Sequence, residues 1–307
     1  MDFTNGEALL SICSSENITI SEAMLRRELF LGETTREAVY EKLARSIGIM
    51  KASTHDPIEH PVKSMGGLLG GESQAVWNYA FGAKSPQPAG SAPAAAIPDV
   101  LPLCGTTLSK AIAYALAVLE VNASMGLIVA APTAGSSGVI PGTVLSICED
   151  YHLGEDAVYE GILNASAVGY IIMHNASVSG AEAGCQAEVG AASAMAASAA
   201  AQLLGGSPSQ CLHAASLALS NLLGLVCDPI AGLVESPCQS RNAIGAANAF
   251  TSAQLALAGI QHPVPFDEMV DAMYKVGLSL PFELRETALG GNAATPTGCS
   301  LCSGCIK

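Results

Sequence analysis

Cysteine is the residue type with the most obvious chemical potential in this chain, which carries ten cysteines in 307 residues. Three of them, Cys185, Cys227 and Cys238, each have a glycine or proline within two positions. Because chains bend at such residues, these thiols could be presented from helix ends, where the helix dipole favours the thiolate. Three convergent thiolates would leave the fourth iron of a four-iron cluster without a protein ligand, and an open iron acts as a Lewis acid. The spacing alone equally allows three buried structural cysteines.

A glycine-rich segment, TAGSSG, offers a second kind of site. Backbone amides in such a turn can approach a ligand closely, and neighbouring hydroxyls could help them cradle a carboxylate. A tight turn without a ligand fits the same local pattern. The candidate substrate-binding residues of this segment are Thr133, Ala134, Gly135, Ser136, Ser137 and Gly138.

The distribution of basic residues limits the chemistry further. No lysine or arginine lies between Lys110 and Arg241. This span therefore supplies neither a cationic side chain for an anion nor a Schiff-base lysine, so we expect no pyridoxal phosphate. Arg241 follows Cys238 by three positions, and it could pair with a substrate carboxylate or cap a helix.

The carboxyl terminus ends in a third cysteine pattern, with Cys299, Cys302 and Cys305 in C-x2-C-x2-C spacing. Such spacing also begins cluster motifs of the ferredoxin type, which would make the tail a separate metal site. A frayed tail with free thiols is the alternative. Four other cysteines have no motif around them and are expected to be small buried hydrophobic residues: Cys13, Cys104, Cys148 and Cys211.

These residues must be positioned by helices, because apolar side chains recur at three- and four-residue spacing through most of the chain. We expect helices over 20–30, 35–50, 108–126, 181–203, 209–226, 241–259 and 266–280, with Thr34 or Thr35 capping the second. The one short strand candidate is 128–132. The predicted fold is all-α. The predicted divisions are an N-terminal helical cover over 1–81, a Pro/Ala-rich loop or linker over 82–102, a single large catalytic domain over 103–298 and a cysteine-rich tail over 299–307.

The composition of the chain excludes several classes of structure and of binding partner. Half of the residues are hydrophobic, which excludes a disordered chain, and the net charge of −14 gives no electrostatic basis for binding nucleic acid. The apolar runs over 161–173 and 212–234 are short or interrupted by polar residues, so no membrane span is expected. The N-terminal residues carry no basic region of a secretory signal, which predicts a cytoplasmic protein with reduced thiols.

Four stretches resemble the alpha chain of iron–sulfur-dependent L-serine dehydratase. They read NASMGLIVAAPTAGSSG, SGAEAGCQAEVGAASAMAA, NLLGLVCDPIAGLVE and PCQSRNAIGAANA, and the resemblance runs from about Leu108 to Thr297. It implies an all-helical catalytic domain that deaminates L-serine to pyruvate and ammonia. It also implies a [4Fe–4S] cluster on Cys185, Cys227 and Cys238, and a separate or fused beta chain as partner.

The same resemblance leaves several roles open. In such enzymes a carboxy-terminal cysteine can occupy the open iron until substrate displaces it; Cys299 is the first candidate here, with Cys302 or Cys305 as alternatives. Asn122, which begins the first matching stretch, joins 133–138 and Arg241 as a candidate substrate-binding residue. The candidate bases for the Cα proton are His174, Lys110 and Glu182, and a base from another chain is a further possibility.

Two other functions remain open at this point. A related cysteine desulfidase would remove sulfide instead of water from the β-carbon, and assays with both substrates would distinguish it. A non-catalytic iron–sulfur protein would bind its cluster through Cys299, Cys302 and Cys305, and would be insensitive to a change at Cys227.

Overall fold

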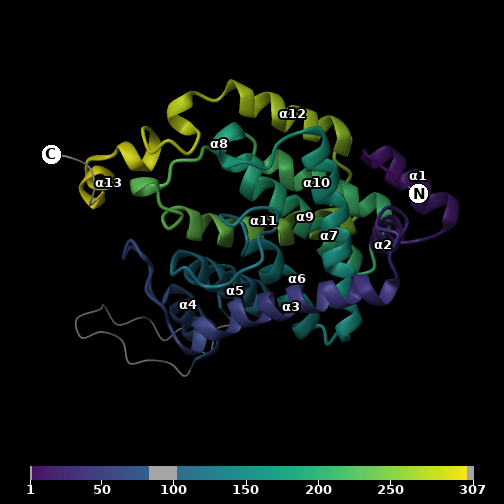
Figure 1. The fold of residues 1–307 in the computed structure, drawn as a ribbon, viewed down its shortest axis with the longest axis horizontal. Coiled ribbons are helices and arrows are strands. Elements are labelled where there is room, and N and C mark those ends of the chain that lie inside the picture. Colours follow the sequence, from purple (N-terminus) through teal and green to yellow (C-terminus); the bar gives the residue numbers. More distant parts are fainter. Residues whose placement is uncertain (1, 83–101, 303–307) are drawn as a thin grey trace.

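The computed structural model describes residues 2–82 and 102–302, and within these ranges the chain is helical (Figure 1). The only β-type pairing among the described residues is an isolated bridge between Cys227 and Arg285. The all-α prediction is therefore confirmed. The predicted linker over 82–102 lies almost wholly outside the described residues, and so does the end of the tail, including Cys305.

Thirteen α-helices are present in the described ranges, together with one π-helical turn and three short 3-10 turns. The α-helices are α1 (Gly6–Glu16), α2 (Ile20–Leu31), α3 (Arg36–Glu59), α4 (Glu72–Phe81), α5 (Gly105–Ala123), α6 (Val139–Asp150), α7 (Glu155–Asn175), α8 (Gly180–Ala183), α9 (Ala191–Leu203), α10 (Pro208–Asn221), α11 (Cys238–Leu257), α12 (Phe266–Ser279) and α13 (Pro296–Leu301). The π turn is η1 (Gln186–Gly190), and the 3-10 turns are η2 (Ile230–Gly232), η3 (Phe282–Leu284) and η4 (Gly291–Ala294).

Helix α9 forms the centre of the molecule. All residues over 191–201 are buried, most of them alanines, and the helix packs against α6, α7, α10 and α11 (Figure 1). Small side chains allow these neighbours to approach closely, which is how a helix without a polar face is stabilised. The N-terminal helices lie outside this group, with α2 packed on α7 and with α3 and α4 packed on α5.

Local signals account for several helix boundaries. The Thr35 side chain caps α3 by accepting a hydrogen bond from the Ala38 amide, as predicted. Helix α10 starts at Pro208 behind a capping box formed by Ser207 and Gln210. No helix within the described ranges is long and apolar enough to cross a bilayer.

Three expectations about elements are wrong in detail. Residues 128–132 form no strand; they are an irregular segment that leads into Pro132. The predicted helix over 181–203 is broken at Gly184, whose φ of 76° ends α8 before the π turn begins. The helix predicted over 209–226 already ends at Asn221, which leaves Cys227 in a loop.

Candidate active site at a buried cysteine centre

Three separate segments bring the predicted cluster cysteines to the same region. Cys185 directly precedes η1, Cys227 lies in the loop between α10 and η2, and Cys238 is the first residue of α11. Their relative exposures are 1%, 2% and 5%. The loop around Cys227 is fixed by backbone hydrogen bonds to Leu284 and Glu286, so the C-terminal part of the chain supports it.

The carboxylate of Glu188 lies beside two of these thiols. The ligand atoms of Cys185, Glu188 and Cys227 all lie within 4.8 Å of one another, a spacing that suits a bound metal. Glu188 lies in η1, three positions after Cys185, so both side chains leave the chain close together. Cys238 is outside that tight group but close enough for its charge to interact with that of Cys185.

The electrostatics of the three thiols differ. The pKa of Cys185 is lowered because Cys227 and Arg241 hydrogen-bond to its sulfur. The same sulfur contact and burial raise the pKa of the Cys227 thiol, and burial together with the Cys185 charge raises that of Cys238. Three buried thiolates would therefore repel one another unless a cationic group lay between them. This soft, buried sulfur set fits a thiophilic iron–sulfur group.

Arg241 supports the centre from the first turn of α11. Its Nη1 donates to Cys185 Sγ at 3.5 Å and to the Val226 carbonyl at 2.8 Å, and its Nη2 pairs with Asp228 Oδ1 at 2.7 Å. The side chains of Arg241 and Asp228 are 14% and 3% exposed. Arg241 is therefore already engaged within the protein, at the sulfur of Cys185.

The glycine-rich segment 133–138 lies beside the same centre. The Thr133 hydroxyl donates to Glu188 and lies 2.9 Å from the Ser136 hydroxyl. A Cβ on Gly135 would lie 2.6 Å from Glu188 Oε1, so a larger residue here would displace the Glu188 carboxylate. Ser136 and Ser137 are fully buried, whereas Ala134 is exposed. The segment therefore touches the cysteine centre through Glu188.

The start of α11 also attaches the N-terminal part of the chain. The Glu235 carboxylate accepts hydrogen bonds from Ser64 Oγ at 2.7 Å and from the amides of Gly66 and Leu68 at 2.6 and 3.0 Å. Gln239 donates to Glu120 Oε1 of α5 at 3.3 Å. These contacts involve residues three positions before and one position after Cys238, and no sequence motif predicts them.

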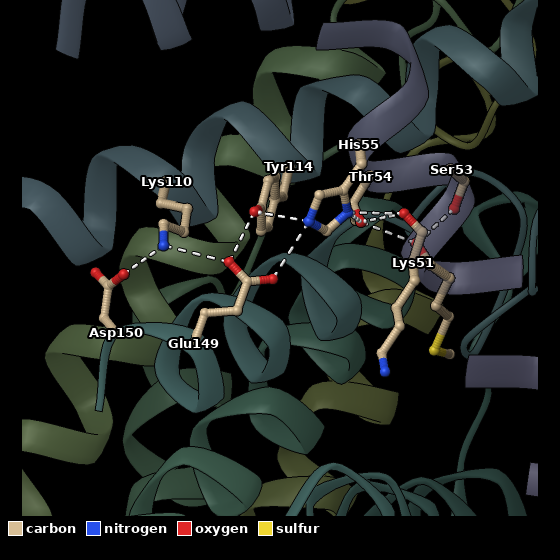
Figure 2. A network of polar contacts seen from close by, with 9 residues as sticks. Lys51, Ser53, Thr54, His55, Lys110, Tyr114, Glu149 and Asp150 are labelled. Carbon is tan, nitrogen blue, oxygen red and sulfur yellow. Dashed lines mark hydrogen bonds and ion pairs between the residues drawn. The ribbon is translucent and has the colours of Figure 1, made fainter. Parts of the chain in front are cut away.

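The three candidate bases do not meet at the cysteine centre. His174 is exposed near the end of α7, where its ring lies 5.8 Å from that of Tyr170. Lys110 pairs with Glu149 at 3.2 Å and with Asp150, in a separate network with Tyr114 (Figure 2). Glu182 is exposed on α8 and accepts a hydrogen bond from Ser177. Asn122 is half-buried near the end of α5.

Glu188 is the acidic group that sequence reasoning missed. It is about 9% exposed, and burial raises the pKa of its carboxyl group. Its sequence signal was its position three residues after Cys185 within GCQAEVG, but a glutamate in an alanine-rich helix has no motif of its own.

The described part of the tail lies near this region without entering it. Asn292 of η4 donates to Asp228 Oδ2 through its backbone amide at 2.7 Å and its side chain at 2.9 Å, and α13 packs against η2. Cys299 is exposed, with its Sγ 3.5 Å from the Ala293 carbonyl oxygen, and Cys302 is half-buried.

Comparison with known proteins adds to these observations. The model of the family "Serine dehydratase alpha chain" matches residues 15–293, which extends the likeness over most of the N-terminal helices. A probable L-serine dehydratase alpha chain of Bacillus subtilis is 42% identical over 299 residues, covering 97% of this chain and 94% of the relative. An L-serine dehydratase alpha chain of Peptoniphilus asaccharolyticus is 43% identical, covering 94% of each chain.

A longer relative shares the same region. The L-serine dehydratase of Streptomyces coelicolor is 36% identical over 300 residues, covering 97% of this chain but 62% of the relative. The matches over nearly the full length of this chain, together with the cysteine centre, lead to one conclusion. The chain belongs to the serine dehydratase alpha chain family.

Proposed function

We propose that this chain catalyses the deamination of L-serine to pyruvate and ammonia, with a [4Fe–4S] cluster held by Cys185, Cys227 and Cys238. The observation that carries the proposal is that three buried cysteines from three segments lie in one region, where the ligand atoms of Cys185, Cys227 and Glu188 are within 4.8 Å of one another and Glu188 contacts the glycine-rich segment 133–138. Membership of a family whose named relatives are L-serine dehydratases supports the choice of substrate. When bound, the cluster would supply a Lewis-acidic iron that makes the substrate hydroxyl a better leaving group.

Residues of the chain itself bind the substrate and stabilise the cysteine ligands. The amides and hydroxyls of 133–138 hold the substrate carboxylate, since backbone amides of a glycine-rich turn can bind an anion without a cationic side chain. Arg241 stabilises the Cys185 thiolate, since its guanidinium is directed at that sulfur, at Val226 and at Asp228. Asn122 stays a candidate for substrate contact at the edge of α5.

We assign the proton transfer at Cα to Glu188, because its carboxylate lies within 4.8 Å of the sulfurs of Cys185 and Cys227 and accepts a hydrogen bond from Thr133 of the glycine-rich segment. Loss of the Cα proton and departure of the hydroxyl group as water give aminoacrylate. That product hydrolyses to pyruvate and ammonia without further catalysis. His174, Lys110 and Glu182 are left as weaker candidates for the base, because their contacts are elsewhere.

The tail and a partner complete the proposal. A tail cysteine, with Cys299 first and Cys302 or Cys305 as alternatives, would occupy the open coordination position until substrate arrives. The relatives named alpha chains and the longer relative both support a beta chain as partner, separate or fused. We place this activity in the cytoplasm, where the thiols stay reduced.

The decisive test uses Cys227→Ser after anaerobic iron–sulfur reconstitution, with and without a beta chain. We expect the wild-type chain to bind about four irons and to release pyruvate from L-serine. Exposure to air should abolish this activity. Cys227→Ser should lose most of the bound iron and the activity, whereas Cys211→Ser, at a buried cysteine in α10, should keep both. Full iron in Cys227→Ser would contradict the ligand assignment. A loaded wild-type chain that releases sulfide from L-cysteine and no pyruvate from L-serine would instead favour the desulfidase.

A further inference from the structure

Asn242 connects the glycine-rich segment 133–138, the proposed carboxylate-binding loop, directly to Cys238. It lies in α11, one turn after Cys238, and it is fully buried. Its Nδ2 donates to the Gly135 carbonyl at 2.7 Å and to the Cys238 carbonyl at 2.9 Å. Its Oδ1 accepts from the Gly138 amide at 3.0 Å. One side chain thus holds both ends of the segment 135–138 and the backbone of Cys238.

The chemistry of the three partners allows a single orientation of this amide. Two carbonyl oxygens require its nitrogen, and one amide proton requires its oxygen. Both Nδ2 protons are used and the oxygen has its donor, so turning the group over would leave three buried polar contacts unmade. Buried hydrogen-bonding groups without partners are costly, and the loop position is therefore tightly specified.

The loop has little freedom on its other sides. A Cβ on Gly138 would lie 2.3 Å from the Ala115 carbonyl oxygen of α5, and a Cβ on Gly135 would lie 2.6 Å from Glu188 Oε1. The loop backbone therefore already packs against α5 and against η1. Asn242 supplies the polar attachment on the α11 side, which sets the separation between the loop amides and Cys238.

We propose that Asn242 is a positioning residue, which aligns the carboxylate-binding loop with the cysteine centre so that both contact one substrate molecule. This inference rests on the proposed function and adds a residue that governs substrate affinity. All three hydrogen bonds of Asn242 go to backbone groups, so it acts through the position of the loop and of Cys238. Its removal should shift the loop and weaken carboxylate binding while the three cysteine ligands remain.

The test compares Asn242→Asp with Asn248→Asp on the same helix. Asn248 is a matched control because its Nδ2 also donates twice, to Ser193 Oγ and the Ala218 carbonyl, and its Oδ1 accepts from Asn221. In each variant the aspartate keeps the shape of the side chain and its accepting Oδ1, but it lacks the donating Nδ2 group. Four quantities are measured: iron per chain, KM and kcat for L-serine, the inhibition constant of glycolate, and deuterium uptake of the peptide over 128–142. Glycolate carries a carboxylate and a hydroxyl but has no β-carbon to eliminate from.

For Asn242→Asp we expect near wild-type iron and faster exchange in 128–142. We also expect a KM and a glycolate inhibition constant raised at least about tenfold, because both buried hydrogen bonds from Nδ2 are lost. Asn248→Asp should change none of these. Iron loss in Asn242→Asp with unchanged affinity and exchange would overturn the proposal, because Asn242 would then support Cys238 alone. Should Asn242→Asp fail to fold, Asn242→Ser is compared in the same four measurements, with the same outcomes decisive. A loaded wild-type chain without serine turnover or glycolate binding would overturn the proposed function itself, together with this inference.

Discussion

At the scale of single residues, the burial of Glu188 beside two thiols gives the sharpest prediction. Glu188→Gln keeps the size and the hydrogen-bond acceptor but cannot take a proton. We expect kcat for L-serine to fall by about 10²- to 10⁴-fold, the usual contribution of a positioned acid or base, with iron content and KM close to wild type. Steady-state kinetics on anaerobically reconstituted protein measure both parameters.

A matched control for that substitution is Glu120→Gln. Glu120 is also a buried glutamate whose pKa is raised by burial, but it accepts hydrogen bonds from Ser73 and Gln239 and is not part of the group formed by Cys185, Glu188 and Cys227. It should affect stability and leave kcat unchanged. A wild-type kcat in Glu188→Gln would return the base to His174, Lys110, Glu182 or a residue of the partner chain.

At the scale of elements, the sequence predicted helices better than the breaks between them. The periodicity over 266–280 matches α12, and Thr35 caps α3 as expected. The site is built where periodicity fails: at the π turn after Gly184, in the loop after Asn221 and in the first turn of α11. Long-range contacts decide these places, such as Glu235 binding the amides of Gly66 and Leu68, and no local pattern encodes them. The cysteines and glycines of the candidate site could be predicted from the sequence, because each residue type has a distinctive chemistry. Glu188 and Asn242 could not be predicted, because their roles depend on partners far away in the sequence.

The C-terminal helix is the element whose role the tail proposal addresses. Helix α13 packs on η2, close to the Asp228–Arg241 pair that contacts Cys185. If a tail cysteine protects the open iron, replacing it by serine should shorten the half-life of the reconstituted activity in air while leaving anaerobic kcat intact. Cys299→Ser, Cys302→Ser and Cys305→Ser are compared individually. The control is Cys104→Ser, because Cys104 is exposed, so the prediction that it is buried is wrong. Equal half-lives in all four variants and the wild type would remove the tail from the active site.

At the scale of the whole molecule, one polar network joins the N-terminal helices to the body (Figure 2). His55 of α3 lies with its Nε2 3.0 Å from the Tyr114 hydroxyl of α5 and 3.3 Å from Glu149 Oε1 of α6, and its Nδ1 lies 2.8 Å from the Lys51 carbonyl oxygen. Both ring nitrogens thus face acceptors, which favours the imidazolium. The Glu149 hydrogen bond raises the pKa of His55, and hydrogen bonds from His55, Tyr114 and Lys110 outweigh burial to lower that of Glu149. The other charged groups around His55 are Lys51, Asp56, Lys110 and Asp150.

The network therefore makes stability depend on pH in a direction that can be measured. Because the pKa of His55 is raised above its usual value of 6.5, its contribution is complete below that value and is lost as pH rises through the folded pKa. We expect the Tm difference between wild type and His55→Gln to be largest near pH 6 and to shrink toward pH 9, where neutral imidazole no longer attracts Glu149. His60→Gln, at an exposed histidine just after the same helix, should give no such pH-dependent difference. A difference that grows with pH would mean that His55 is neutral in the folded protein. The polar link from α3 to α5 would then be the hydrogen bond between His55 Nε2 and the Tyr114 hydroxyl, which itself donates to Glu149 Oε2 of α6 at 2.8 Å.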